Sequence, residues 1–293
     1  MTDSLRARLE TALGSPIVET APMSVGFGLT GLTARLRDGR RVAVKARTQS
    51  QSTRAGAGPS LELEGTMLSE LARLSDLPVP HVHVAEPDLL VMDFIENDGG
   101  PITPDVERDA ARLIASLHGT PRERFGFARD TLIGPLPQPN PESALWVPFF
   151  RDHRLMHMAR AAHDEGRLPA PLFGRIERLA ARLDDYLLEP PHPSLLHGDL
   201  WTGNVLVRGK AIAGFVDPAI YFGHPEIELA FTTMFGTFGE AFFETYEALS
   251  PLEPGFHDLR RDLYNLYPTL VHVRLFGAAY LSGIERTLAR LGI

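Results

Sequence analysis

Hydrophobic and polar positions follow two different patterns along the chain. Over residues 17–47 and 81–96, short apolar runs alternate with polar residues and are interrupted by turn residues, which predicts β-strands. Residues 1–13 and 61–74 carry apolar side chains at helical spacing and predict two helices. The polar, glycine-rich stretch 48–60 predicts a mobile loop. The first third of the chain is therefore expected to form a small β-rich lobe.

Helical spacing dominates the rest of the chain. The pair Thr103-Pro104 is a typical helix start, because proline is favoured just inside a capping residue. Outside the helical segments, the proline-rich stretch 125–143 is expected to be a loop and residues 205–217 a strand–turn–strand. Further helices are predicted at 144–166, at 172–188 and in the C-terminal third, where the apolar stretch 267–284 is expected to be a buried helix.

The turn at Asn97–Pro101 is the expected boundary between these two regions. The sequence therefore predicts an α+β, bilobal protein, with a β-rich N-terminal lobe at 1–96 and a larger, mainly helical lobe at 97–293.

Composition narrows the classes of function. The 293 residues carry a net charge of -8, so a basic nucleic-acid-binding face is not expected. No apolar run reaches membrane-spanning length and residues 1–10 lack a signal-peptide core, so the expectation is a cytoplasmic protein without a membrane partner. The absence of cysteine excludes disulfides and thiol catalysis. The oligomeric state cannot be read from the sequence, and a monomer is favoured.

The chain uses arginine for almost all of its positive charge. Lys45 and Lys210 are its only lysines. Lysine offers a compact ammonium that arginine does not replace, so each lysine marks a position where that group is needed or tolerated. Lys45 ends an apolar strand, whereas Lys210 lies in a turn and is expected to be a surface residue.

The stretch "HGDLWTGNVLVRGKAIAGFVDPA" carries a catalytic pattern. Phosphoryl transfer needs a residue that positions the attacking hydroxyl, oxygen ligands for Mg²⁺ and a cation on the nucleotide phosphates. Asp199 and Asn204 have the Asp-x-x-x-x-Asn spacing of the kinase catalytic loop, and Asp217 follows across a hairpin as the metal-binding aspartate does. Each residue alone is more often a cap or a turn residue, and it is their combination that indicates catalysis.

Lys45 tests this interpretation independently. It ends "RVAVK", a strand like the Val-Ala-Ile-Lys strand of kinases, whose lysine contacts the ATP phosphates and pairs with a glutamate on the next helix. Glu64 is the predicted partner because it shares a helix face with Leu61 and Leu68. Glu62 is the alternative and points elsewhere on that helix.

Two further segments are candidates for nucleotide binding. The turn "SVGFGLTG" precedes the Lys45 strand and could cover phosphates with the backbone amides of Gly26, Phe27 and Gly28, although it departs from G-x-G-x-x-G. The end of "LLVMDFIE" is the expected hinge, where adenine could bond the backbone at Asp93, Phe94 and Ile95.

The chain resembles the fructosamine kinase (ketosamine 3-kinase) family. The resemblance rests on "LLHGDLWTGNVL", "VDPAIYFGHPEIELAFT" and "LYNLYPTLVHVRLFGAAY" and extends over essentially the whole chain. It implies the aminoglycoside-phosphotransferase-like form of the protein kinase fold. It also implies ATP- and Mg²⁺-dependent phosphorylation of the 3-hydroxyl of a ketosamine, free or on a glycated lysine, which promotes deglycation.

The resemblance also implies roles for individual residues. Asp199 would be the catalytic base, and Asn204 and Asp217 the metal ligands. Trp201 would form an aromatic platform near the sugar or its amine, with packing in the C-terminal lobe as the alternative. Glu228-Leu-Ala departs from the family's usual aspartate at this position, and its extra methylene is expected to alter how the carboxylate supports the catalytic loop.

Two other functions stay open on the sequence alone. One is a phosphotransferase of the aminoglycoside or choline type that acts on another amino-alcohol. The other is a non-catalytic pseudokinase that binds nucleotide or a partner. The presence of Lys45, Asp199, Asn204 and Asp217 together disfavours a pseudokinase. The segment after Asp217 is too short for a phosphorylated activation loop, which predicts constitutive activity.

Overall fold

The computed structural model describes residues 1–47 and 60–293, and the stretch 48–59, predicted as a loop, lies outside them. The chain divides into two compact units, one formed by Met1–Gly100 with Val205–Pro218 and the other by Pro101–Asn204 with Ala219–Ile293. The boundary expected at 96/97 assigns residues 205–218 to the C-terminal lobe, whereas in the structure these residues belong to the first unit.

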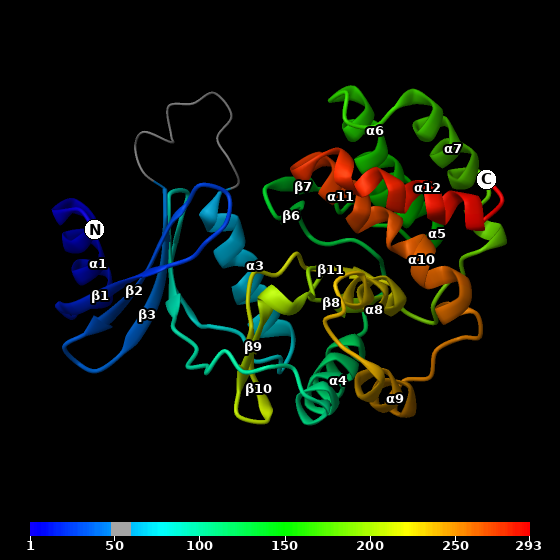
Figure 1. The fold of residues 1–293 in the computed structure, drawn as a ribbon. Coiled ribbons are helices and arrows are strands. Elements are labelled where there is room, and N and C mark those ends of the chain that lie inside the picture. Colours follow the sequence, from blue (N-terminus) through cyan, green and yellow to red (C-terminus); the bar gives the residue numbers. More distant parts are fainter. Residues whose placement is uncertain (48–59) are drawn as a thin grey trace. The chain divides into compact units, whose positions relative to one another are not determined.

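The first unit is built on a five-stranded antiparallel sheet of order β1-β2-β3-β5-β4. Figure 1 labels β1, β2 and β3 of this sheet. Beside the sheet, Asp98 accepts from the backbone N–H of Gly209 and donates its own N–H to the carbonyl of Val207, which ties the β9–β10 hairpin to this unit. Its elements are α1 (Asp3–Leu13), β1 (Ile17–Met23), β2 (Thr30–Leu36), β3 (Arg41–Ala46), α3 (Leu61–Leu74), β4 (Val82–Glu86), β5 (Leu89–Asp93), β9 (Val205–Arg208) and β10 (Ala211–Phe215).

The alternation of side chains along β3 decides which helix each one meets. Val42 and Val44 lie in the apolar cluster that also holds Leu9 of α1, whereas Ala43 lies in the cluster that holds Leu68 of α3. Because successive side chains of a strand point to opposite faces, Lys45 shares the α3 face with Ala43. The sequence of β3 thus directs the buried lysine toward α3.

The second unit is mainly helical and contains short two-stranded pairings (Figure 1). Its helices are α4 (Pro104–His118), α5 (Trp146–Phe150), α6 (Met156–Asp164), α7 (Ala170–Ala180), α8 (Pro225–Met234), α9 (Glu240–Leu249), α10 (Arg261–Tyr264), α11 (Leu266–Phe276) and α12 (Leu281–Arg290). Its strands are β6 (Thr131–Ile133), β7 (Leu136–Gln138), β8 (Ser194–Leu196) and β11 (Tyr221–Gly223). Short helical turns lie at Arg151–Leu155, Leu183–Asp185, Thr202–Asn204, Phe256–Arg260 and Ala278–Tyr280.

Trp146 is the centre of the core of this unit. Its side chain is fully buried among aromatic rings, including those of Phe150 and Tyr264. Its indole N–H donates to the hydroxyl of Tyr264 at 2.9 Å, so the polar atom of the buried ring is satisfied. The ring of Trp146 also lies 6.0 Å from that of His224, which caps α8, one of the helices that line the pocket described below.

Two expectations about the second unit need correction. The stretch 125–143, expected as a loop, contains the antiparallel pair β6–β7. The pair is short, and its second strand includes Pro137, so the usual alternation of strand residues was not recognisable. The C-terminal apolar stretch 267–284, expected to be one buried helix, is divided where α11 ends at Phe276, because Gly277 follows with a φ of 90° that suits glycine alone.

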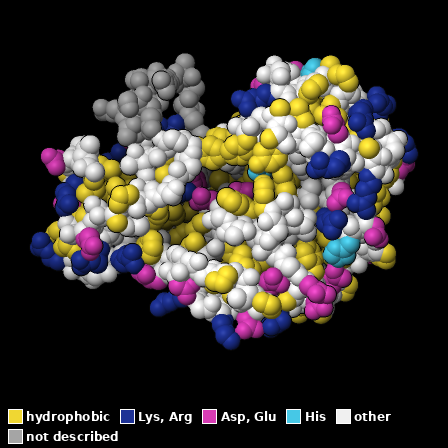
Figure 2. Space-filling view, in the orientation of Figure 1, with side chains coloured by type: hydrophobic (Ala, Val, Ile, Leu, Met, Phe, Trp, Pro, Cys, Tyr) yellow, Lys and Arg dark blue, Asp and Glu magenta, His cyan; other side chains and the backbone are white. Residues whose placement is uncertain are grey.

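The charged side chains on the surface carry both signs, as the composition of the chain indicates. On the face drawn in Figure 2, acidic and basic side chains of the second unit lie intermingled. Within the part of the chain that the structure describes, no helix combines the length and the apolar character needed to cross a bilayer.

Candidate active site

Lys45 lies between two carboxylates in the first unit. Its Nζ is 2.7 Å from Oε1 of Glu64 on α3 and 2.6 Å from Oδ1 of Asp217, which follows the β9–β10 hairpin. Its side chain is 8% exposed, and although burial favours loss of the proton, the two carboxylates raise the pKa of Lys45 above its usual value. The ammonium is therefore charged, and Glu64 rather than Glu62 pairs with it.

The surroundings of Glu64 destabilise its charged form. Burial raises the pKa of Glu64, and the nearby carboxylate of Asp217 raises it further, against the opposing effect of Lys45. Two carboxylates that share one ammonium repel each other. A cationic ligand for Asp217 would relieve this repulsion and leave Lys45 paired with Glu64 alone.

The backbone of Asp217 is held in an unusual conformation. Its φ is 54°, in the left-handed region that residues other than glycine rarely adopt. Such conformations cost free energy and are concentrated at functional sites. The side chain is 44% exposed, so its carboxylate is accessible to a ligand while one oxygen contacts Lys45.

The other candidate nucleotide residues also belong to the first unit. Phe27 and Gly28 have φ values of 56° and 73°, and the N–H of Leu29 donates to the carbonyl of Gly26, so these residues form a tight turn between β1 and β2. Phe27 at its tip is 56% exposed.

The hinge has fewer available backbone donors than expected. The N–H of Asp93 donates to the carbonyl of His81, and the N–H of Phe94 donates to the carbonyl of Arg41. Both bonds join the end of β5 to the chain beside it on either side. Of the backbone N–H groups at Asp93, Phe94 and Ile95, where adenine is predicted to bond, that of Ile95 is the remaining candidate donor.

In the second unit, Asp199 and Asn204 contact each other directly. Nδ2 of Asn204 donates to the carboxylate Oδ2 of Asp199 at 3.0 Å and to its carbonyl at 2.8 Å. The Thr202–Asn204 turn closes the intervening loop, so the four-residue spacing found in the sequence places one side chain on the other. With its amide nitrogen directed to Asp199, the amide oxygen of Asn204 is an oxygen donor of the kind that Mg²⁺ prefers.

The backbone conformation at position 198 explains why a glycine precedes the candidate base Asp199. The φ of Gly198 is 85°, and a Cβ built there would lie 2.0 Å from the carbonyl oxygen of Ala219. The backbone N–H of Ala219 in turn donates to the carbonyl of His197 at 2.7 Å. Only glycine permits this close approach, which fixes the main chain immediately before Asp199.

Glu228 also supports the loop that precedes Asp199, through its buried carboxylate. Its carboxylate accepts from the N–H of Gly198 at 2.6 Å and of His197 at 3.3 Å, and it contacts Nε2 of His118 at 2.9 Å. His118 in turn contacts the hydroxyl of Tyr246 at 2.7 Å. Burial alone would raise the pKa of Glu228, but the bonds to His118 and the loop outweigh burial and lower it.

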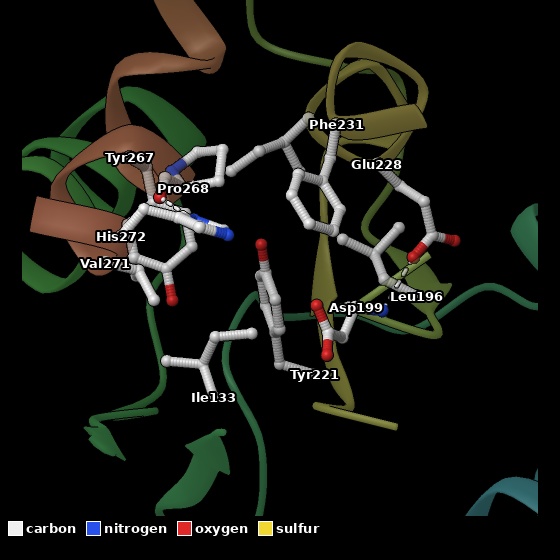
Figure 3. Close-up of a pocket in the computed structure, with 12 residues that line it drawn as sticks. Ile133, Leu196, Asp199, Tyr221, Glu228, Phe231, Tyr267, Pro268, Val271 and His272 are labelled. Atoms are coloured by element: carbon white, nitrogen blue, oxygen red, sulfur yellow. Dashed lines mark hydrogen bonds between the residues drawn. The ribbon is translucent and has the colours of Figure 1, made fainter. Parts of the chain in front are cut away.

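A pocket opens beside Asp199 within the second unit. Figure 3 shows the Asp199 carboxylate and the Tyr221 ring between side chains of α8 and α11. Burial raises the pKa of Tyr221 and of Tyr267, so both stay neutral phenols. The lining includes the polar groups Asp199, Tyr221, Glu228, Tyr267 and His272, and the apolar side chains Ile133, Leu196, Ile227, Phe231, Pro268 and Val271.

Arg154 places a buried positive charge behind this pocket. It is fully buried, its guanidinium lies 3.9 Å from the centroid of the Tyr221 ring, and it donates to Oδ1 of Asn140 at 2.6 Å. Sequence reasoning did not single out Arg154, Tyr221, His118 or Tyr267. Their partners are distant along the chain, and a lone buried tyrosine or histidine has no distinctive spacing.

Trp201 does not line the pocket. Its side chain is 40% exposed and lies over Gly203, where an added Cβ would meet the indole at 2.4 Å. Its ring is 6.1 Å from that of Phe235. In the "WTG" sequence, the lack of a side chain at Gly203 therefore leaves room for the exposed indole of Trp201, two residues after Asp199.

Comparison with known proteins places these features in one family. Residues 1–292 match the model of the fructosamine kinase family. The chain is 32% identical to the "Probable ketoamine kinase" of Synechocystis over 289 residues, which covers 97% of this chain and 95% of that protein. It is 32% identical over 241 residues to the chloroplastic protein-ribulosamine 3-kinase of Arabidopsis thaliana, with coverage of 78% and 72%.

Solved structures give the same result for the fold. The structure described as a "putative fructosamine-3-kinase" from Thermobifida fusca superimposes with a TM-score of 0.89 at 30% identity over 99% of both chains. An aminoglycoside phosphotransferase in complex with ADP and hygromycin B superimposes with a TM-score of 0.67 at 14% identity, over 98% of this chain and 96% of that one, and shows the fold alone. The predicted α+β fold of aminoglycoside-phosphotransferase-like kinases is confirmed.

Proposed function

The chain belongs to the fructosamine kinase family, and from this membership and its site residues we propose that it is an ATP-dependent ketosamine 3-kinase. It would transfer phosphate to the 3-hydroxyl of a fructosamine or ribulosamine, free or carried by a glycated lysine, and so promote deglycation. The observation that carries the proposal is the family match over residues 1–292, within which the complete set Lys45, Asp199, Asn204 and Asp217 is present. The proposal includes a small-molecule substrate, no nucleic-acid partner, and a cytoplasmic monomer.

The first unit would bind the nucleotide. Lys45, oriented by Glu64, would contact the phosphates, and the amides of Gly26, Phe27 and Gly28 would cover them. The backbone of Asp93, Phe94 and Ile95 would receive adenine, with the N–H of Ile95 as donor. All of these residues lie within one unit.

Mg²⁺ fits the chemistry of the candidate ligands. Asp217 offers an exposed carboxylate whose repulsion from Glu64 a cation would relieve, and Asn204 offers an amide oxygen. When bound, the ion would neutralise negative charge on the phosphate oxygens. In the second unit, Asp199 would accept the proton of the attacking hydroxyl, while Asn204 holds the Asp199 carboxylate in place. Trp201 would contact the substrate.

The two neutral phenols and the apolar lining suit the uncharged, polyhydroxylated sugar part of the acceptor. Tyr221 can hydrogen-bond a sugar hydroxyl, and Tyr267, whose hydroxyl donates to Oε1 of Gln138, can accept from one. The largely apolar wall limits access of water to the reacting groups. A pocket of this kind also accepts another amino-alcohol, so the alternative of an aminoglycoside- or choline-type substrate is part of the test.

The test measures ATP consumption with fructosyl-lysine and ribulosyl-lysine against an aminoglycoside panel and choline. We expect turnover with the ketosamines and a product phosphorylated at the 3-hydroxyl, identified by NMR. Turnover with the aminoglycosides or choline alone would replace the proposed substrate class. The Asp199→Ala variant should lose turnover by a factor of about 10² to 10⁴ and still be stabilised by ATP in a thermal melt, because the predicted nucleotide residues lie in the other unit.

A further inference from the structure

An exposed row of aromatic rings runs across one face of the second unit. Trp201, Phe235 and Phe276 are 40%, 41% and 58% exposed. Phe235 lies 6.1 Å from Trp201 and 5.1 Å from His272, and His272 lies 5.4 Å from Phe276 and 5.0 Å from Tyr280, measured between ring centroids. These five residues are here called the aromatic patch, in which His272 and Tyr280 are partly exposed. Contiguous exposed apolar surface is a common feature of binding sites.

The aromatic patch is continuous with the pocket at Asp199. His272 belongs to both, because it lines the pocket together with Asp199 and contacts Phe235 in the patch. Phe231, which lines the pocket, meets the ring of Phe235 edge-on at 6.1 Å. The patch is therefore an outward extension of the acceptor pocket within the same unit.

The chemistry of a ketosamine requires such an extension. The nitrogen is carried by C1 of the sugar, only a few bonds from the 3-hydroxyl that Asp199 would activate. The group attached to the nitrogen must therefore leave the pocket close to Asp199. Trp201 begins the patch two residues after Asp199, and its backbone N–H donates to the Asp199 carbonyl at 3.2 Å.

We propose that the aromatic patch receives the nitrogen substituent of the ketosamine and makes the enzyme selective for ketosamines of aromatic and long aliphatic amines. Aromatic faces attract both apolar groups and the protonated secondary amine that joins the substituent to the sugar. This inference rests on the proposed ketosamine kinase activity and names the part of the substrate, outside the sugar, that sets its specificity.

The test compares ketosamines that share fructose and differ only in the amine. Fructosyl-benzylamine and fructosyl-hexylamine are compared with fructosyl-ethanolamine, which has a short polar substituent. The expected KM of the wild-type enzyme is about three- to tenfold lower for the first two, with kcat within about twofold. Phe276→Ser and Phe235→Ser should raise KM for the benzyl and hexyl substrates by about the same factor and leave KM for the ethanolamine substrate unchanged.

A matched control is available in the same unit. Leu249, at the end of α9, is 56% exposed and lies outside both the pocket and the aromatic patch, so Leu249→Ser should leave all three KM values unchanged. Light scattering of each variant measures its oligomeric state. A patch variant that changes the molar mass while KM stays constant would identify a surface between two copies of the chain and overturn the inference.

The inference and the proposed function fail in different ways. If no ketosamine is phosphorylated by the wild-type enzyme, the proposed function is wrong and the inference falls with it. If ketosamines are phosphorylated with equal KM values for all three amines, or if the patch variants change all three substrates equally, the function stands and the inference alone is overturned.

Discussion

Lys45 can be tested against Lys210, the only other lysine of the chain. Lys45 is buried between Glu64 and Asp217, whereas Lys210 lies in the exposed turn between β9 and β10. We expect Lys45→Met to lower kcat/KM for ATP by about 10² to 10³, the usual effect of removing one electrostatic contact to the transferring group, and Lys210→Met to leave it unchanged. Steady-state kinetics with circular dichroism as a check of folding measure this. Equal effects of the two substitutions would remove Lys45 from nucleotide binding.

Glu228 offers a second comparison at the same scale, because Glu226 lies two residues away on α8 and is equally buried. Glu228 accepts from the backbone before Asp199, whereas Glu226 forms an ion pair with Arg260. Both Glu→Gln variants should lose stability, about 3–5 kcal/mol where a buried charge loses its partner.

Only Glu228→Gln should also lower kcat, because an amide keeps one acceptor oxygen and must present its NH2 group to one of the two backbone N–H groups, of Gly198 or of His197, which displaces the loop. KM for ATP should stay within about twofold. Kinetics at a temperature where both variants are folded, normalised to the active fraction, measure the difference. A kcat reduced equally in both variants would assign Glu228 to stability alone.

The residues that the sequence could identify are those with a short, chemically distinctive spacing. Asp199 and Asn204 are separated by one turn, and Lys45 lies near the end of a strand whose alternation directs it toward Glu64. His118 contacts Glu228 across 110 positions of sequence, and no local pattern marks such a pair. The contact between His118 and Glu228 is recognisable only from the three-dimensional arrangement of α4 and α8.

At the scale of elements, the packing of α3 on the sheet depends on Gly65. A Cβ added to Gly65 would lie 2.6 Å from the Cβ of Ala85 and 3.0 Å from Leu90. Gly65→Val should therefore force α3 away from the sheet at a cost of about 1–3 kcal/mol, despite the better helix propensity of valine. Because Glu64 is the adjacent residue, kcat/KM should fall as well.

Gly174 in α7 is the control for Gly65. An added Cβ there meets only the end of the Arg178 side chain, at 3.9 Å. Gly174→Ala should stabilise the protein by about 0.5–1 kcal/mol, since alanine is the better helix former. Urea unfolding of both variants gives the two free energies. If Gly65→Val proves as stable as the wild type, the close contact between α3 and the sheet is not present in solution.

Elements were predictable where one periodicity extended over enough residues. The helix expected at 61–74 is α3 with the same bounds, and the Thr103-Pro104 signal begins α4. The β6–β7 pair is not predicted by the sequence, because its strands are too short for a two-residue alternation to be recognised. The helical segment expected at 144–166 is present but contains a widened turn at Arg151–Leu155. The packing around buried Arg154, which no helical period encodes, accompanies that turn.

At the scale of the whole chain, neither of the two structural units is one continuous segment of sequence. The hairpin of β9 and β10 lies far along the chain but packs with the first unit, and Asp217 follows it. A linear reading separates lobes at one point and cannot show that a later hairpin returns to the earlier unit. The lysine and the carboxylate that contacts it are 172 positions apart in the sequence yet belong to one unit.

The stability of the whole protein should depend on pH through His224. This residue caps α8, and its ring nitrogen Nδ1 accepts from the N–H of Glu226 at 3.1 Å. Burial, together with the positive charge of Arg260, lowers the pKa of His224 from 6.5 to about 3. Between these two values the unfolded chain binds a proton that the folded chain does not, so the free energy of unfolding falls as the pH falls.

Replacement of His224 by asparagine isolates this contribution. Asparagine also caps helices but does not titrate, so His224→Asn should be less stable near pH 7, where packing around the ring is lost, and should lose less stability on acidification. The slopes of unfolding free energy against pH should differ by up to about 1.4 kcal/mol per pH unit between about pH 6 and 4. Urea unfolding at several pH values measures both slopes, and the remaining histidines contribute equally to each. Parallel slopes would mean that His224 takes up its proton in the folded state, and that the N-terminus of α8 opens to admit it before the protein unfolds.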